Sequence, residues 1–279
     1  MRHPGFLAHL IVSAKRHWNN YLTEAAGIFL FLFMAGFITT AVNHPDWWLA
    51  RQLAGHEVLG RAVIGLVVGL TVVVIVYSPW GKRSGAHVNP AVTLAFWQLG
   101  KIRLADACWY LLAQVAGALL AGQALLGLLG RYFAHPKVDY ALTKPGPEGM
   151  AVAFGAEFLI TFIMVAVLFL ALHTQRLQNL AGWLLGALLA LYVVVETPYS
   201  GMSLNPARSL GSAVAAHDYG ALWVYWVAPP LAAWLAAVLF QLLFRDSPLS
   251  GSSIAGPASN SGDHTATNTS EEPPQHPVE

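Results

Sequence analysis

Charged side chains are scarce in this sequence: Asp, Glu, Lys and Arg make up only 10% of its 279 residues. A soluble globular domain carries about 25% charged residues, so the chain has too little polar surface to be one. The formal net charge of +1, with no basic stripe and interleaved aromatics, gives no reason to expect a nucleic-acid partner. The single cysteine, Cys108, excludes an intrachain disulfide. No catalytic, metal-binding or phosphate-binding constellation stands at a plausible spacing, so we expect neither an enzyme nor a cofactor.

What the sequence has in abundance is long apolar runs, with 56% hydrophobic residues overall. Roughly 20 consecutive apolar residues are needed to cross a bilayer, and six segments qualify, the second and fifth being short. The sequence therefore predicts an all-α membrane protein with six transmembrane helices. The expected spans are Tyr21–Val42, Ala62–Tyr77, Ala105–Leu129, Met150–Leu172, Leu180–Val195 and Leu222–Phe244.

The orientation follows from Lys and Arg in the connections. With the N-terminus inside, the inner side carries nine of them and the outer side five, leaving Arg208 aside. This predicts a multi-pass protein of the inner or plasma membrane with both termini in the cytoplasm. The inner residues are Arg2, Lys15, Arg16, Lys82, Arg83, Lys101, Arg103, Arg176 and Arg245; the outer ones are Arg51, Arg61, Arg131, Lys137 and Lys144.

An internal repeat organises the chain. "SGAHVNPAVTL" (84–94) and "SGMSLNPARSL" (200–210) align without gaps at an offset of 116 residues. Each unit holds three spans, an odd number, so the second unit enters the membrane from the opposite side, as in many transport proteins. The expected parts are a cytoplasmic segment 1–20, a first repeat 21–129, an extracellular connection 130–149, a second repeat 150–244 and a disordered cytoplasmic tail 245–279, which is rich in Ser, Pro, Gly and Thr.

Each repeat contains an Asn-Pro-Ala stretch that favours a helix start. Asn is a strong N-cap, and Pro is tolerated in the first helical turn. Eleven residues from Asn89 to Leu99 would span about 16 Å, about half of a hydrocarbon core of roughly 30 Å. Two re-entrant half-helices would then meet tip to tip near the midplane. The two starts are Asn89-Pro90-Ala91 and Asn205-Pro206-Ala207.

Irregular backbone at membrane depth is tolerated only where it is buried in protein or lines a water-filled cavity. We expect the carbonyls of 84–88 and 200–204 to form a ladder of acceptors along a water path, with the side-chain amides of Asn89 and Asn205 as donors at its midpoint. The two positive helix ends repel cations and protons there.

Arg208 stands one turn into the second half-helix, where the first repeat has Val92. A charge at this depth costs about 2.5–3.5 kcal/mol on insertion scales, so it must face water or a partner. We expect it to face the water path, repelling cations and donating hydrogen bonds to solutes. The alternative is that it pairs with an acid and only anchors its loop.

The six spans, the two Asn-Pro-Ala motifs, "NPARS" and the repeat-related Glu24 and Glu157 resemble the aquaporin or major intrinsic protein family over about residues 20–245. The resemblance implies a homotetramer with one pore per subunit and passive conduction of water or small uncharged solutes. It also implies that Glu24 and Glu157 accept hydrogen bonds from backbone N–H groups of the re-entrant loops. His87 is similar to a family histidine near the inner vestibule, in either a structural or a pore-lining role.

Family selectivity filters combine the arginine with three other positions, which fall here on Val68 or Gly69, on Val193 and on Met202. Such a filter is apolar on three sides and wider than a strict water filter. Other positions resemble the water-channel pattern instead: they are Ser209, Ala213 and the pair Tyr225-Trp226.

The sequence thus predicts a channel for water and small uncharged solutes that excludes ions and protons. The alternative within the class is a facilitator of glycerol, urea or neutral metalloid hydroxides with little selectivity for water. Glu196 stands three residues after Val193, on nearly the same helix face. We hypothesise that it lies at the outer mouth and pairs with or lies near Arg208, against the alternative of a solvated interfacial acid.

Overall fold

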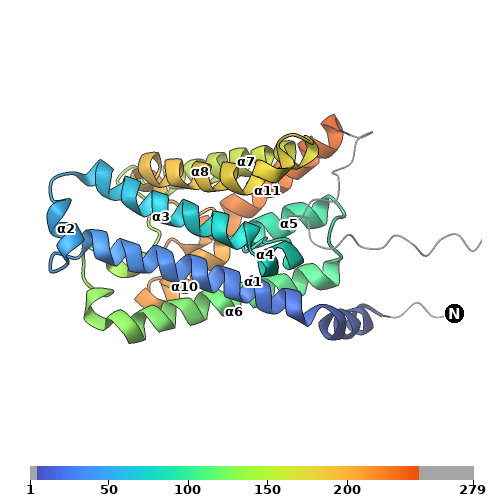
Figure 1. Ribbon diagram of the computed structural model, residues 1–279, viewed down its shortest axis with the longest axis horizontal. Helices are drawn as coiled ribbons and strands as arrows, with labels where there is room; N and C mark the ends of the chain where they lie inside the picture. The colour runs from blue at the N-terminus through green and yellow to red at the C-terminus, as the bar shows by residue number, and fades with distance from the viewer. Residues whose placement is uncertain (1–4, 245–279) are drawn as a thin grey trace, which may run out of the picture.

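The computed structural model describes residues 5–244, which form a bundle of membrane-length helices (Figure 1). Within this part of the chain, six helices are long and apolar enough to span a membrane. The predicted tail lies outside the described residues. The six are α1 (Phe6–Asn43), α3 (Glu57–Tyr77), α6 (Leu104–Leu129), α7 (Met150–His173), α8 (Ala181–Val195) and α11 (Leu222–Leu243).

The first helix is longer than the sequence suggests, since it begins at Phe6 and not near Tyr21. No Pro or Gly interrupts the chain between Gly5 and Gly27, so nothing stops a helix in this stretch. The backbone leaves helical geometry at His17, with φ −120° and ψ 15°, which divides α1 into two segments. Part of the predicted cytoplasmic segment 1–20 is therefore a helix continuous in sequence with the first span.

Two half-length helices complete the bundle: α5 (Pro90–Gln98) and α10 (Pro206–Ala216). Nine and eleven residues give lengths of about 14 and 16 Å, too short to cross a membrane. Asn89 and Asn205 are their N-caps, each side chain accepting a backbone N–H two residues later. The remaining short helices lie in the connections: α2 (Trp48–Gln52), α4 (Pro79–Ser84), α9 (Thr197–Ser200), and the 3-10 turns η1 (Gly130–Tyr132), η2 (Asp139–Ala141) and η3 (Gln178–Leu180).

The long helices pack as the repeat requires. The first and third spans of each repeat are in contact, α1 with α6 and α7 with α11, while the second spans α3 and α8 contact each other across the repeats. The α3–α8 contact depends on glycine: a Cβ at Gly69 would lie 2.3 Å from the carbonyl oxygen of Gly186. Small residues allow helices in membranes to approach this closely.

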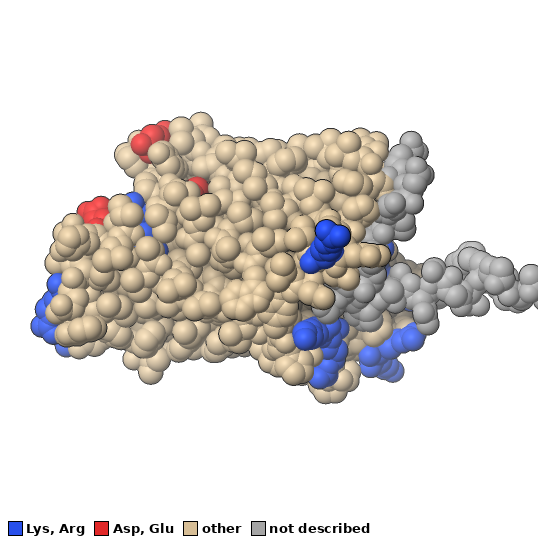
Figure 2. Space-filling model, turned by 45° about the horizontal axis from the view of Figure 1, so that its top comes forward, with Lys and Arg blue, Asp and Glu red and all other residues tan. Residues whose placement is uncertain are grey.

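The surface fits a bilayer. Charged side chains on the face shown in Figure 2 gather towards the two ends of the molecule, and a broad uncharged area separates them. Large apolar side chains such as Leu112, Leu120 and Leu128 of α6 are exposed on the outside of the bundle. With six apolar helices, this makes the chain a multi-pass membrane protein.

Candidate functional site: a pore between the two half-helices

The two loops that lead into the half-helices share one unusual backbone conformation. Ala86 and Val88 have positive φ in the first loop, and Met202 and Leu204 have it at the equivalent places in the second. An L-residue in this region costs roughly 1–2 kcal/mol, and a β-branched residue such as Val88 rarely adopts it. Strain repeated at matched positions must be held in place by surrounding contacts.

Glu24 of α1 supplies those contacts in the first loop. Its buried carboxylate accepts hydrogen bonds from the backbone N–H of His87 at 3.1 Å and from that of Val88. The Ser84 hydroxyl donates to it at 2.7 Å, and the Gln114 amide from α6 donates at 2.8 Å. Four donors converge on two oxygens, which fixes the loop against α1.

Glu157 of α7 does the same in the second loop. It accepts from the backbone N–H of Ser203 at 2.7 Å and of Leu204 at 2.8 Å, and from the Ser200 hydroxyl at 2.6 Å. Glu157 is fully buried, like its counterpart. Both glutamates therefore make the backbone contacts that the family resemblance implies.

The half-helix tips meet through their capping asparagines. The Asn89 amide donates to the carbonyl of Leu204 at 2.8 Å, and the Asn205 amide donates to the carbonyl of Val88, also at 2.8 Å. Each asparagine thus caps its own helix and binds the loop of the other repeat. An amide has two N–H groups, so a second donor remains on each side chain.

The ladder of carbonyl acceptors is shorter than expected. Four of its members are engaged within the protein, because the hydroxyls of Tyr110 and Tyr225 donate to the carbonyls at the start of the loops, at 2.6 Å each, and the asparagines donate to those at the end. This leaves the carbonyls of 85–87 and 201–203 as the inner part of the ladder. The engaged carbonyls are those of Ser84, Val88, Ser200 and Leu204.

Sequence reasoning missed the residues that support the loops from the third spans. Tyr110 and Gln114 of α6 bind the first loop, and Tyr225 of α11 binds the second. The tyrosines stand near the starts of equivalent helices, α6 and α11. The repeat offset of 116 residues pairs Tyr110 with Trp226 and not with Tyr225, so the repeat alone does not find the two tyrosines.

A cavity of about 710 Å³ reaches from the ends of the helices to residues 201–203 of the second loop; we call it the outer cavity, after the side that the sequence predicts to be outside. Val68, Val193, Met202 and Arg208 all line it, and all four are largely buried. Gly69, the alternative to Val68, lies instead in the α3–α8 contact described above. We call these four residues the filter; they combine three apolar side chains with one guanidinium.

Arg208 reaches this cavity from α10 and makes no ion pair among the described residues, although it interacts electrostatically with Glu157. Its Nη1 donates to the carbonyl of Ala141 at 2.9 Å and lies 3.4 Å from the Ser212 hydroxyl. The alternative in which an acid pairs with it is thus wrong for this structure. The Ala141 contact ties the guanidinium to the connection between the two repeats.

A smaller inner cavity, of about 70 Å³, continues on the other side. Asn89, Asn205 and His87 line it together with apolar side chains, and Phe31 and Ser203 line both cavities. The two spaces therefore adjoin at the centre of the bundle.

His87 has both a structural and a cavity-facing side. Its Nδ1 lies 3.2 Å from the Thr93 hydroxyl, and its ring stacks on Phe96 at a centroid distance of 4.6 Å. Its Nε2 has no hydrogen-bond partner among the described residues although it is buried, and the residue lines the inner cavity.

Glu196 makes no ion pair with Arg208 among the described residues, so the pairing is wrong, while its nearness to Arg208 stays a prediction. It is 5% exposed, so it is not a solvated interfacial acid either, and Ser200 and the backbone N–H of Met202 lie near its carboxyl. It follows the end of α8, and burial and the nearby Glu157 raise the pKa of its carboxyl. Glu196 caps the end of α8 with its N–H bound to the carbonyl of Tyr192, so helical spacing from Val193 still holds at this residue.

Taken together, the chain is a helical membrane protein whose two inverted half-helices frame adjoining cavities, lined by asparagine amides, one guanidinium and apolar side chains. These are the features of a passive membrane channel. Irregular backbone at this depth lines a cavity, and the two buried glutamates Glu24 and Glu157 hold that backbone in place.

Comparisons with known proteins agree with the assignment as a membrane channel. The family model for the major intrinsic protein matches residues 11–240. Similar proteins include a probable aquaporin, NIP7-1, of Arabidopsis thaliana (36% identity, 79% of this chain and 74% of that protein) and aquaporin NIP1-2 of Oryza sativa subsp. japonica (39%, 82% and 73%). Nodulin-26 of Glycine max is 33% identical, over 82% of this chain and 79% of its own.

Among solved structures, the X-ray structure of the aquaglyceroporin from Plasmodium falciparum shares the fold, with a TM-score of 0.65 and 23% identity. It covers 80% of this chain, and 94% of that chain is matched. The chain belongs to the major intrinsic protein family and is a membrane channel for water and small solutes.

Proposed function

We propose that this channel conducts small uncharged hydroxylated solutes of about the size of glycerol as well as water. The observation that carries the proposal is the lining of the filter in the outer cavity, which brings the apolar side chains of Val68, Val193 and Met202 together with the guanidinium of Arg208. The carbon skeleton of such a solute contacts the apolar walls, while its hydroxyls accept hydrogen bonds from the guanidinium. Methionine adapts its shape to the solute.

We further propose that Asn89 and Asn205 bind the solute oxygen next along the path, each through its second amide N–H. The positive ends of α5 and α10 face the same point and repel cations and hydronium. Glu24 and Glu157 hold the loops and take no part in conduction. Conduction needs no catalytic step, cofactor or metal. The partners of the channel are the lipid bilayer, water and small neutral solutes.

A matched set of filter variants tests the solute range. Stopped-flow swelling of proteoliposomes is followed in water, glycerol and urea gradients, with empty liposomes as the baseline. The unmodified channel is expected to pass water and glycerol. Val193→His adds a polar ring to an apolar wall, and we expect it to lower glycerol permeability about tenfold or more, because the pore narrows, while water permeability falls less. Val193→Leu keeps the wall apolar and serves as the control for added bulk.

The competing candidate is a water channel that rejects glycerol, favoured by the water-type residues Ser209 and Ala213. Water flux without glycerol flux in the unmodified protein would establish it. Permeation of both water and glycerol supports the proposal based on the filter.

We also infer a homotetramer in a cell membrane with both termini in the cytoplasm. The family resemblance supports the tetramer, and the excess of Lys and Arg on the inner side supports the orientation. Light scattering of the detergent-solubilised protein tests the mass, and tags at each terminus, probed with protease in intact cells, test the topology.

A further inference from the structure

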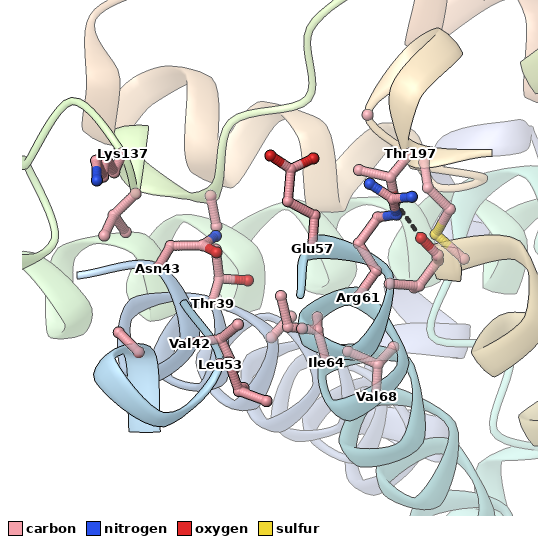
Figure 3. Close-up of a pocket in the computed structure, with 18 of the residues that line it drawn as sticks. Thr39, Val42, Asn43, Leu53, Glu57, Arg61, Ile64, Val68, Lys137 and Thr197 are labelled. Atoms are coloured by element: carbon pink, nitrogen blue, oxygen red, sulfur yellow. Dashed lines mark hydrogen bonds between the residues drawn. The ribbon is translucent and has the colours of Figure 1, made fainter. Parts of the chain in front are cut away.

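Three arginines line the outer cavity, Arg51, Arg61 and Arg208, and Arg61 is half-buried on α3 near the mouth. Its Nε donates to the carbonyl of Val194 at 3.0 Å, so one edge of the guanidinium is fixed to the end of α8. Within the described chain, its two terminal nitrogens donate to no protein group, while the side chain lines the cavity beside Glu57 and Thr197 (Figure 3). A guanidinium has five N–H donors, so four remain for a solute.

Arg61 stands directly above the filter on one face of α3. Arg61, Ile64 and Val68 are spaced three and four residues apart, so they share a helix face, and all three line the cavity. Figure 3 shows them in this order along the helix. Seven residues separate Arg61 from Val68, a rise of about 10 Å. A three-carbon solute is too short to bind at both levels at once, so the two levels act in sequence.

The other charges at the mouth are placed differently. Arg51, Lys137 and Glu57 line the same cavity but are exposed, and exposed charges are screened by salt over about 8–10 Å. Arg61 combines partial burial with an anchored guanidinium, which reduces the entropy lost when it binds a solute. It is therefore the vestibule cation best placed for hydrogen bonding to a neutral molecule.

We propose that Arg61 is a second specificity-determining residue, which binds hydroxylated neutral solutes at the mouth before they enter the apolar filter beside Arg208. Its terminal N–H groups donate to solute hydroxyls and replace part of the water that the solute must lose. Water itself needs no such binding site, because a water molecule is small enough to enter the filter while it keeps hydrogen bonds to other waters. This inference rests on the proposed passage of hydroxylated solutes.

The test uses proteoliposomes with Arg61→Met, which keeps an unbranched apolar stem and removes the guanidinium donors. The matched control is Arg51→Met, which removes an exposed charge from the same cavity. We expect Arg61→Met to lower glycerol uptake at low concentration about tenfold, the effect of one hydrogen bond to a charged group, and to raise the half-saturating glycerol concentration by a similar factor. Water permeability should stay within about twofold, and Arg51→Met should change neither quantity beyond that.

The readouts separate binding from structure. If Arg61 only fixed α8 through Val194, its loss would shift Val193 and change water permeability as much as glycerol permeability, which would overturn the proposal. Equal glycerol uptake by Arg61→Met and Arg51→Met would overturn it too. An unmodified channel that passes water but no glycerol would refute the proposed function, and this inference with it; glycerol flux unaffected by Arg61→Met would refute the inference alone.

Discussion

The substitution Glu24→Gln tests how the pore loops are held. The carboxylate receives four donors: the N–H groups of His87 and Val88, the Ser84 hydroxyl and the Gln114 amide. A glutamine in the same position offers one carbonyl oxygen and one NH₂ group, which is a donor. Two of the four donors then face another donor inside the protein, where no water replaces the lost acceptor.

The expected loss of stability follows from that count. Each buried donor left without an acceptor costs roughly 1–3 kcal/mol, so two cost about 2–6 kcal/mol. For a protein of this size, 1 kcal/mol corresponds to about 2–4 °C in melting temperature, which gives a decrease of roughly 5–20 °C. The strained residues Ala86 and Val88 relax when their anchor is lost, so conduction should fall as well.

The assay is the fraction of detergent-solubilised protein that remains monodisperse after heating, paired with water permeability in proteoliposomes. Glu148→Gln, at an exposed position of the connection between the repeats, makes the same chemical change without buried donors and serves as the control. The reasoning is refuted if Glu24→Gln melts together with Glu148→Gln and conducts like the unmodified protein.

Three further predictions test the filter, the helix contact and the buried acid. Arg208→Val reproduces the residue of the first repeat, and we expect proton leak, measured with an internal pH dye, to rise about tenfold or more because a fixed positive charge is lost; unchanged leak would contradict this role. Gly69→Ala should lower the melting temperature by several degrees, since its Cβ meets the Gly186 carbonyl, while Gly127→Ala, with open space around its Cβ, should not. Burial raises the pKa of Glu196 to about 8. The folded state therefore holds a proton that the unfolded state releases, and the free energy of unfolding falls as pH rises from about 5 to 8. Glu196→Gln should remove this pH dependence from the melting temperature, and an unchanged pH dependence would argue against the role of Glu196.

The half-helices could be predicted from sequence because their signals are local. An asparagine cap, a proline at the first position and a repeated motif specify each helix start, whatever surrounds it. The meeting of the two tips followed from the odd number of spans in each repeat. The start of α1 at Phe6 was missed because residues 1–20 were judged by their polar composition. That composition does not end a helix, and no Pro or Gly stands between Gly5 and Gly27.

Other features depend on how whole helices are rotated and where they end. Val68 and Gly69 are neighbours, so only the rotation of α3 against α8 decides which one lines the cavity. Spacing placed Glu196 on the filter side of α8, but its burial beside Glu157 depends on how α7, α8 and the second loop pack together. The binding of each asparagine to the opposite loop arises from tertiary packing, which no local pattern encodes.

The proposed function requires a continuous water-filled passage beside Arg208 and between the tips of the two half-helices. An experimental structure in lipid, at a resolution that shows ordered water, tests it most directly. We expect a file of waters from the outer cavity to the inner one, with a water within hydrogen-bonding distance of the Asn89 and Asn205 amides. A dry gap at that point in a protein that conducts water would contradict the account.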